Sequence, residues 1–140
     1  MNLLMNEKDL NDFLDRDFSQ VKDDFVVHKV SDKKILVEFI VGERHLRPGG
    51  TVSGPTMFSL ADVASYLVIL AQIGPKALTV TINASMDFMR KPASGANLMC
   101  ECEILKLGRR LAVVDSRIFS KGSNDIVARS TMTYSIPPKR

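Results

Sequence analysis

A stretch near the middle of the chain, PTMFSLADVASYLVILAQI, is apolar on nearly every side, and it constrains the fold more than any other feature. It begins at Pro55, after a loop that contains four glycines, and it ends at Gly74-Pro75. Proline just inside a helix and glycine just past its end are boundary signals. Because a helix without a polar face must be buried, the sequence predicts a central helix over about 55–72 that other elements enclose.

Runs of alternating apolar and polar residues lie on both sides of this helix and predict strands. The predicted strands cover 25–30 and 35–41 before the helix, and 78–88, 98–104, 110–119 and 126–136 after it. The inward face of the 110–119 run is ambiguous. Since consecutive strands with short connections pair in antiparallel fashion, we expect an α+β fold. One antiparallel sheet wraps around one central buried helix, in a single domain over 1–140.

The N-terminal segment predicts a further helix, over about residues 7–20. Asn6 is placed to cap its first turn, which carries two acidic side chains. Leu10, Phe13, Leu14, Phe18 and Val21 recur at helical spacing.

Charge is unevenly distributed along the chain. Residues 1–85 hold 9 basic and 11 acidic side chains, and residues 86–140 hold 10 basic and 5 acidic ones. A basic C-terminal half suits an anionic ligand, although a solvated positive face would produce the same count. The chain has no Trp, only 6% aromatic residues and no nucleic-acid motif, so we expect no nucleic-acid partner.

We expect a cytoplasmic protein that has no membrane partner. Ser65, Tyr66 and Gln72 interrupt the longest apolar run, which falls short of the ~20 residues that a membrane helix needs. The N-terminus has no basic segment followed by a long apolar one, as a secretory signal would. Cys100 and Cys102 would share one face of a strand, too close for an ordinary disulfide, and are predicted to be small core residues in a reduced compartment. No residue set suggests a metal site.

Asp62 is the first candidate for chemistry. A carboxylate inside an apolar helix is costly unless it is paired or hydrogen-bonded, and a positioned carboxylate can act as a general base. A purely structural pairing remains equally open. The second candidate is the start of the helix, where unpaired N–H groups favour an oxygen that becomes negative. Gly54 permits close approach there and Pro55 has no N–H, although turn formation alone would also explain these residues.

The segment RPGGTVSGPTMFSLADVASYL resembles the signature of the PaaI-like (phenylacetyl-CoA type) hotdog thioesterases. That family's motif runs roughly Asn-x-x-Gly-x-x-His-Gly-Gly, with an Asp nine residues after the His. Gly50, Gly54 and Asp62 fall on its glycines and its Asp. Arg47 stands where the family has Asn, Ser53 where it has His, and Pro55 where it has the last Gly. Segments TINASMDFMRKPASG, LGRRLAVVDSRIFS and DIVARSTMTYSI resemble the family's later strands, so the resemblance covers about 35–136.

The resemblance implies the hotdog fold and hydrolysis of an acyl-CoA thioester, with no cofactor because coenzyme A is part of the substrate. Asp62 would be the general base or nucleophile, and the Gly54 N–H the oxyanion donor. Thr81 would be a hydroxyl residue that holds the water or nucleophile. Ser53 and Arg47 occupy catalytic positions of the family. The expected substrate-binding residues are Gly50, Asn83, Arg90, Lys91, Arg109 and Arg110.

The spacing along the helix favours a homodimer or homotetramer. Pro55 and Asp62 are about 10 Å apart along a helix axis, whereas reacting groups must meet within about 3–3.5 Å. Two antiparallel helices across a two-fold axis would bring Asp62 of one chain near Gly54 of the other, and the resemblance implies the same arrangement. Two alternatives stay open. One is a hydratase or dehydratase on the same fold, which the missing His disfavours. The other is a non-catalytic acyl-CoA binder or scaffold, which the replacement of the family's His and Asn keeps open.

Overall fold

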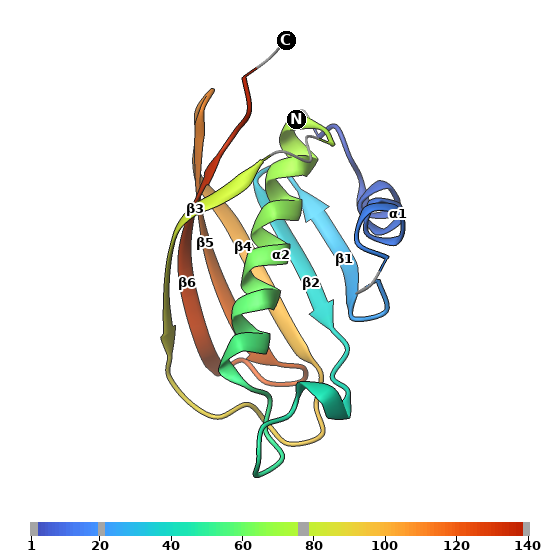
Figure 1. The fold of residues 1–140 in the computed structure, drawn as a ribbon, viewed down its shortest axis with the longest axis vertical. Coiled ribbons are helices and arrows are strands. Elements are labelled where there is room, and N and C mark those ends of the chain that lie inside the picture. Colours follow the sequence, from blue (N-terminus) through green and yellow to red (C-terminus); the bar gives the residue numbers. More distant parts are fainter. Residues whose placement is uncertain (1–2, 20–21, 76–78, 139–140) are drawn as a thin grey trace.

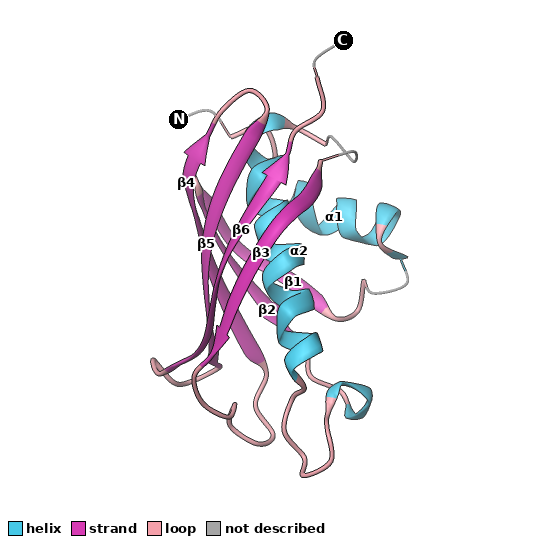
Figure 2. Ribbon diagram, turned by 60° about the vertical axis from the view of Figure 1, so that its left-hand side comes forward, coloured by secondary structure: helices cyan, strands magenta, loops and turns pink. Residues whose placement is uncertain are grey.

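The computed structural model describes residues 3–19, 22–75 and 79–138 (Figure 1). In the described residues, six strands form one antiparallel sheet in the order β1-β2-β4-β5-β6-β3, and the sheet curls around α2 (Figure 2). This arrangement confirms the predicted α+β class and the hotdog architecture. The elements are α1 (Glu7–Asp17), β1 (Phe25–Ser31), β2 (Lys34–Phe39), η2 (Glu43–His45), α2 (Gly54–Ile73), β3 (Val80–Phe88), β4 (Leu98–Leu107), β5 (Leu111–Ser120) and β6 (Ile126–Ser135).

Helix α2 begins and ends close to where the sequence predicts. Ser53 is its N-cap, Pro55 lies in its first turn, and Gly74 ends it at φ +91°. With a mean hydropathy of 1.6, α2 is the one described helix long and apolar enough to cross a bilayer, so the expectation that no run reaches that length is wrong. The mean hydropathy of α2 stays high although the helix contains a few polar residues. Since 61% of its apolar stretch is buried inside the fold, the enclosing sheet accounts for the apolar character of the helix.

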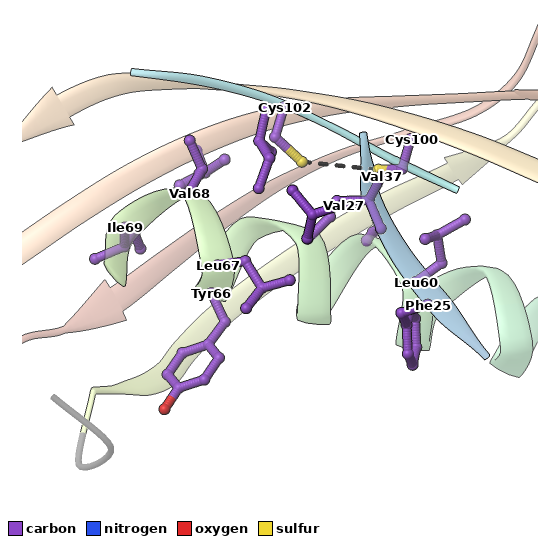
Figure 3. Close-up of a cluster of buried hydrophobic side chains, with 14 of the residues drawn as sticks. Phe25, Val27, Val37, Leu60, Tyr66, Leu67, Val68, Ile69, Cys100 and Cys102 are labelled. Atoms are coloured by element: carbon purple, nitrogen blue, oxygen red, sulfur yellow. Dashed lines mark hydrogen bonds between the residues drawn. The ribbon is translucent and has the colours of Figure 1, made fainter. Parts of the chain in front are cut away.

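The core fills the space between α2 and the concave face of the sheet. Figure 3 shows Leu60 and Leu67 of α2 pointing toward side chains of the strands. Cys100 and Cys102 are 0% and 1% exposed, with their Sγ atoms 3.7 Å apart. This burial confirms that both cysteines are core residues. The ambiguous face of β5 is also resolved, since the buried positions are Ala112, Val114, Ser116, Ile118 and Ser120.

Helix α1 covers the outer edge of β1. The Asn11 side chain accepts a hydrogen bond from Val27 N (2.9 Å) and donates one to Val27 O (3.1 Å). The Glu7 carboxylate accepts from Val30 N at 2.9 Å. These side chains satisfy backbone groups that an open sheet edge would present to another strand. The predicted cap at Asn6 is confirmed.

The N-terminal helix is shorter than the predicted 7–20. It ends at Asp17, because Phe18 takes a non-helical conformation (φ −126°, ψ 44°). Val21 and Leu78, two residues of the predicted apolar patterns, lie outside the described residues.

Strand β3 forms the opposite edge of the sheet and is open. Its side chains Val80, Ile82 and Phe88 are 52%, 56% and 53% exposed. A bulge between Thr81 and Asn83 shifts the register against β6. Because an extra residue in a strand reverses which side chains face the core, Thr81 faces α2 before the bulge and Phe88 faces it afterwards. The strict alternation predicted for 78–88 is therefore wrong.

Two further strand boundaries differ from the prediction. Strand β2 ends at Phe39 rather than at Val41, because Ile40 N donates to Asp24 O (2.8 Å) and Val41 N donates to the Asn97 side chain (3.0 Å). Strand β4 extends to Leu107, past the predicted end at 104, with an irregularity between Ile104 and Lys106. A bulge interrupts the apolar alternation there, so the sequence pattern stops before the strand does.

A buried carboxylate, Glu38 of β2, connects β1 with the residue before β4 and the residue after β5. Glu38 is 4% exposed. Its oxygens contact His28 Nε2 (2.6 Å), Asn97 Nδ2 (2.7 Å) and Lys121 Nζ (3.1 Å). Burial by itself raises the pKa of Glu38, but the hydrogen bonds from Asn97, His28 and Lys121 outweigh it and lower the pKa to about 2.

We expect Glu38→Gln to destabilise the protein in a pH-dependent manner. A carboxyl with a lowered native pKa stabilises the fold above its ordinary pKa of about 4.5, and this stabilisation is lost as pH falls through about 2. The free energy of unfolding should drop by about 1–3 kcal/mol near neutral pH, and the difference from wild type should shrink below pH 4.5. Urea unfolding between pH 2 and pH 7 measures this, with the exposed Glu101→Gln as control. A difference that is constant over this range would contradict the assignment.

Candidate active site

The Asp62 carboxylate lies on the side of α2 that faces β3 and β6. Its Oδ1 accepts two hydrogen bonds, from Thr81 Oγ1 at 2.7 Å and from Tyr134 Oη at 2.5 Å. Tyr134 Oη also lies 2.7 Å from the Asp62 backbone O. Among the described residues, no donor contacts Oδ2. Two hydroxyl groups thus hold one carboxylate oxygen and leave the other available to a substrate or water.

Tyr134 is the residue of this site that sequence reasoning missed. It is 1% exposed. Burial, followed by the negative charge of Asp62, raises the pKa of Tyr134 far above its usual range, so the hydroxyl stays protonated and donates. The available signal was a tyrosine at an inward position of the predicted 126–136 strand, because a buried tyrosine hydroxyl needs a partner. The partner lies 72 residues away in the chain, and the pattern does not indicate which residue it is.

Gly54 and Ser53 form the start of α2. Ser53 Oγ accepts from Thr56 N (3.3 Å) and donates to Thr56 Oγ1 (2.9 Å), so the structure gives Ser53 a capping role. The Gly54 N–H has no acceptor among the described residues. A Cβ at Gly54 would lie 3.5 Å from the Phe88 ring, and both residues line the same pocket.

The loop before Gly54 is a tight turn. Gly50 has a φ of +84°, a conformation that favours glycine, and its N–H donates to Arg47 O at 3.0 Å. Arg47 N donates to Thr51 O (2.8 Å), and Ser53 N donates to His45 O (3.0 Å). These bonds fix the backbone that leads into the helix, while the Arg47 side chain is exposed.

Asp62 and Thr81 line one pocket, Arg47 and Gly54 line another, and the remaining predicted catalytic residue, Ser53, lines neither. The first, the Asp62 pocket, has a volume of about 250 Å³, and the second, the Gly54 pocket, about 330 Å³. They share no lining residue. The Asp62 pocket is lined by Phe18, Asp62, Val63, Tyr66, Thr79, Val80, Thr81 and Tyr134. The Gly54 pocket is lined by Arg47, Thr51, Val52, Gly54, Met57, Phe88, Met89, Arg90, Lys91 and Pro92.

The remaining predicted substrate residues are dispersed. Arg109 and Arg110 line a third cavity of about 680 Å³, which Ile73 and Ile136 also line. Asn83 is exposed on β3, directly after the bulge, and Gly50 lies in the turn; neither lines the three cavities. Within the described residues, no group of three His, Cys, Asp or Glu side chains could hold a metal ion.

Comparison with known proteins identifies the family. The sequence profile of the thioesterase superfamily matches residues 49–127. A putative thioesterase from Silicibacter sp. TM1040 is 52% identical, with a TM-score of 0.92 over 99% of this chain and 96% of that chain. Phenylacetic acid degradation protein PaaI from Thermus thermophilus, solved as a mutant, is 26% identical, with a TM-score of 0.73 over 85% of this chain and 99% of that one.

Among curated proteins, acyl-coenzyme A thioesterase 13 from Homo sapiens is 24% identical over 119 residues, which cover 84% of each chain. The profile match extends over more than half of the chain, and it includes the start of α2, Asp62 and Thr81. The chain belongs to the thioesterase superfamily, a family of thioester hydrolases, and has its hotdog fold.

Proposed function

We propose that the protein hydrolyses acyl-CoA thioesters to the free acid and coenzyme A, with Asp62 as the group that activates water. The observation that carries this proposal is the Asp62 carboxylate, which lines a pocket and whose Oδ1 is held by Thr81 and Tyr134, while no described donor contacts Oδ2. The similarity to acyl-coenzyme A thioesterase 13 supports an acyl-CoA as substrate.

The reaction that follows from this geometry is acyl transfer to water. The thioester carbonyl oxygen accepts a hydrogen bond from the Gly54 N–H. Because this N–H lies at the helix N-terminus, it stabilises the negative charge that develops on the oxygen. Asp62 takes a proton from water, and the water oxygen bonds to the carbonyl carbon. The carbon–sulfur bond then breaks, and the proton returns from Asp62 to the thiolate. In the alternative route for the same residue, an Asp62 oxygen attacks the carbonyl carbon, the carbon–sulfur bond breaks and releases the thiolate, and water then cleaves the resulting anhydride to free acid and Asp62.

The proposed site combines residues of two protomers. Gly54 and Asp62 are eight residues apart in α2, or about 12 Å along its axis, and they line separate pockets. Helix α1 closes the β1 edge, whereas the β3 edge is open and carries exposed apolar side chains. We therefore propose a homodimer that pairs β3 with β3 and brings each Asp62 pocket against the Gly54 pocket of the partner. The association of two such dimers into a homotetramer remains an expectation.

Basic side chains provide the proposed contacts to the coenzyme A phosphates. Arg47, Arg90 and Lys91 line the Gly54 pocket, where no described acidic residue lies. Arg109 and Arg110 line the cavity that also includes the end of α2 at Ile73. An antiparallel dimer would bring this end of one protomer toward the other protomer's Gly54 end.

Replacing both Arg109 and Arg110 by Ala should raise KM for acyl-CoA about 10-fold and change kcat less. Phosphates are remote from the reacting bond, so their contacts contribute equally to binding of ground state and transition state. The salt dependence of KM should also weaken. Steady-state kinetics at low and high salt measure both effects, with Arg117→Ala, which alters an exposed β5 arginine, as control. A KM that stays at the wild-type value at low salt would remove these arginines from the site.

A thiol-release assay with acyl-CoAs of different chain length tests the proposed activity. Turnover that exceeds the uncatalysed rate supports hydrolysis. Binding without turnover would indicate an acyl-CoA binder or scaffold. If absorbance measurements show that an enoyl-CoA loses its double bond, the protein is a hydratase instead.

A further inference from the structure

Polar and apolar side chains both line the Asp62 pocket. The hydroxyl groups of Thr81 and Tyr134 donate to the carboxylate. Phe18, Val63, Tyr66 and Val80 also line the pocket, and no described Lys or Arg does. By contrast, three basic side chains line the Gly54 pocket. The two pockets therefore differ in charge, as the two ends of an acyl-CoA molecule do.

Phe18 reaches this pocket from the end of α1. Its ring makes an edge contact with the Tyr66 ring, with centroids 5.8 Å apart and an interplanar angle of 79°. Phe13, which is 1% exposed, contacts both rings at 6.1 Å. Since Asn11 anchors α1 to β1 in the same region, the core fixes the position of the Phe18 ring. A wall held in this way can limit the size of a bound group.

Thr79 provides a second observation on this pocket. It is 4% exposed and lines the pocket, and its Oγ1 is the one buried side-chain N or O in the described part of the chain without a hydrogen-bond partner. Buried hydroxyl groups are nearly always paired in native proteins. The unpaired hydroxyl indicates that a bound molecule or a partner protomer completes the pocket.

We infer that the acyl group of the substrate occupies the Asp62 pocket and that Phe18 sets the longest chain this pocket accepts. The inference rests on the proposed hydrolysis, because it places the thioester between Asp62 and the partner's Gly54. Coenzyme A then extends into the basic Gly54 pocket and the acyl group into the apolar one. Because packing against Phe13 and Tyr66 holds the Phe18 ring in the lining of this pocket, the inferred substrate class is compact acyl groups rather than long fatty acyl chains.

Substitution of Phe18 should change chain-length selectivity in a predictable direction. One methylene in an apolar pocket is worth about 10–200-fold in kcat/KM. Phe18→Ala removes the wall and should move the optimum to longer chains, raising the kcat/KM ratio of dodecanoyl-CoA to butanoyl-CoA at least about 10-fold. Phe18→Trp should move the optimum to shorter chains. Leu105→Ala, on an exposed side chain of β4, is the matched control and should leave the profile unchanged.

Two readouts separate this inference from the proposed function. The first is kcat/KM over a series from butanoyl- to tetradecanoyl-CoA. The second is the Kd of S-alkyl-CoA thioethers of the same lengths, measured by calorimetry, which requires no hydrolysis. A wild-type protein that binds but does not hydrolyse would refute the proposed function, and a thioether preference that shifts with Phe18 would still support the inference. The inference is overturned if neither readout shifts for Phe18→Trp and Phe18→Ala. If the alanine variant does not fold, Phe18→Leu takes its place in this test.

Discussion

Asp62→Asn is expected to lower kcat by roughly 10²–10⁴-fold, the usual contribution of a positioned general base. Asn has nearly the same size as Asp, and its Oδ1 can still accept from Thr81 and Tyr134, whose hydroxyl groups hold this position. What is lost is the free carboxylate oxygen that takes the proton. Because a partly buried charge also disappears, the free energy of unfolding should hold or rise slightly. Thiol release, thermal unfolding and binding of an S-alkyl-CoA measure the three quantities.

Asp12→Asn is the matched control for this variant. Asp12 is an exposed carboxylate of α1 whose ion pair among the described residues is with Lys8 at 2.8 Å, so its removal should affect neither turnover nor binding. If Asp62→Asn unfolds the protein and the remaining folded fraction is fully active, Asp62 is a structural carboxylate. Arg47, Ser53 and Thr81 would then be the next candidates for the catalytic group.

Ile82→Lys is expected to convert the proposed dimer to monomers and to lower activity at least about 100-fold, because each site would lose the half that its partner contributes. Ile82 sits in the β3 bulge and is 56% exposed. A lysine there places a charge at the open edge, which is how natural sheets prevent edge pairing. Sedimentation velocity at micromolar concentration and thiol release measure the two effects. Leu105→Lys is a closely matched control, since Leu105 lies in the β4 irregularity and is 60% exposed.

A mixing experiment tests directly whether the site is shared. Asp62→Asn lacks the base, and Gly54→Pro lacks the N–H at a helix position that tolerates proline. A heterodimer of the two variants has one site with both Asp62 and Gly54 intact, so random mixing should restore about a quarter of wild-type activity. If both groups acted within one chain, mixing would restore nothing. Such a result, or a monomeric wild-type protein, would refute the shared site.

Local periodicity and composition in the sequence determined the main elements of the fold. An apolar stretch between Pro55 and Gly74 predicts a buried helix, and the alternating runs after it predict a half-buried sheet. Motif spacing also indicated Gly54 and Asp62 as candidates. These features depend on residues that are close together in the chain, so one sequence is enough to predict them.

Only the tertiary structure decided how distant residues combine. The bulge at Ile82 turns Thr81 toward Asp62, and the pairing of β6 with β3 brings Tyr134 to the same carboxylate from 72 residues away. Packing of α1 against β1 leaves β3 as the open edge and places Phe18 in the lining of the Asp62 pocket. Strand register and the position of a bulge depend on contacts between segments far apart in sequence, and a pattern along one segment carries no information about its partner.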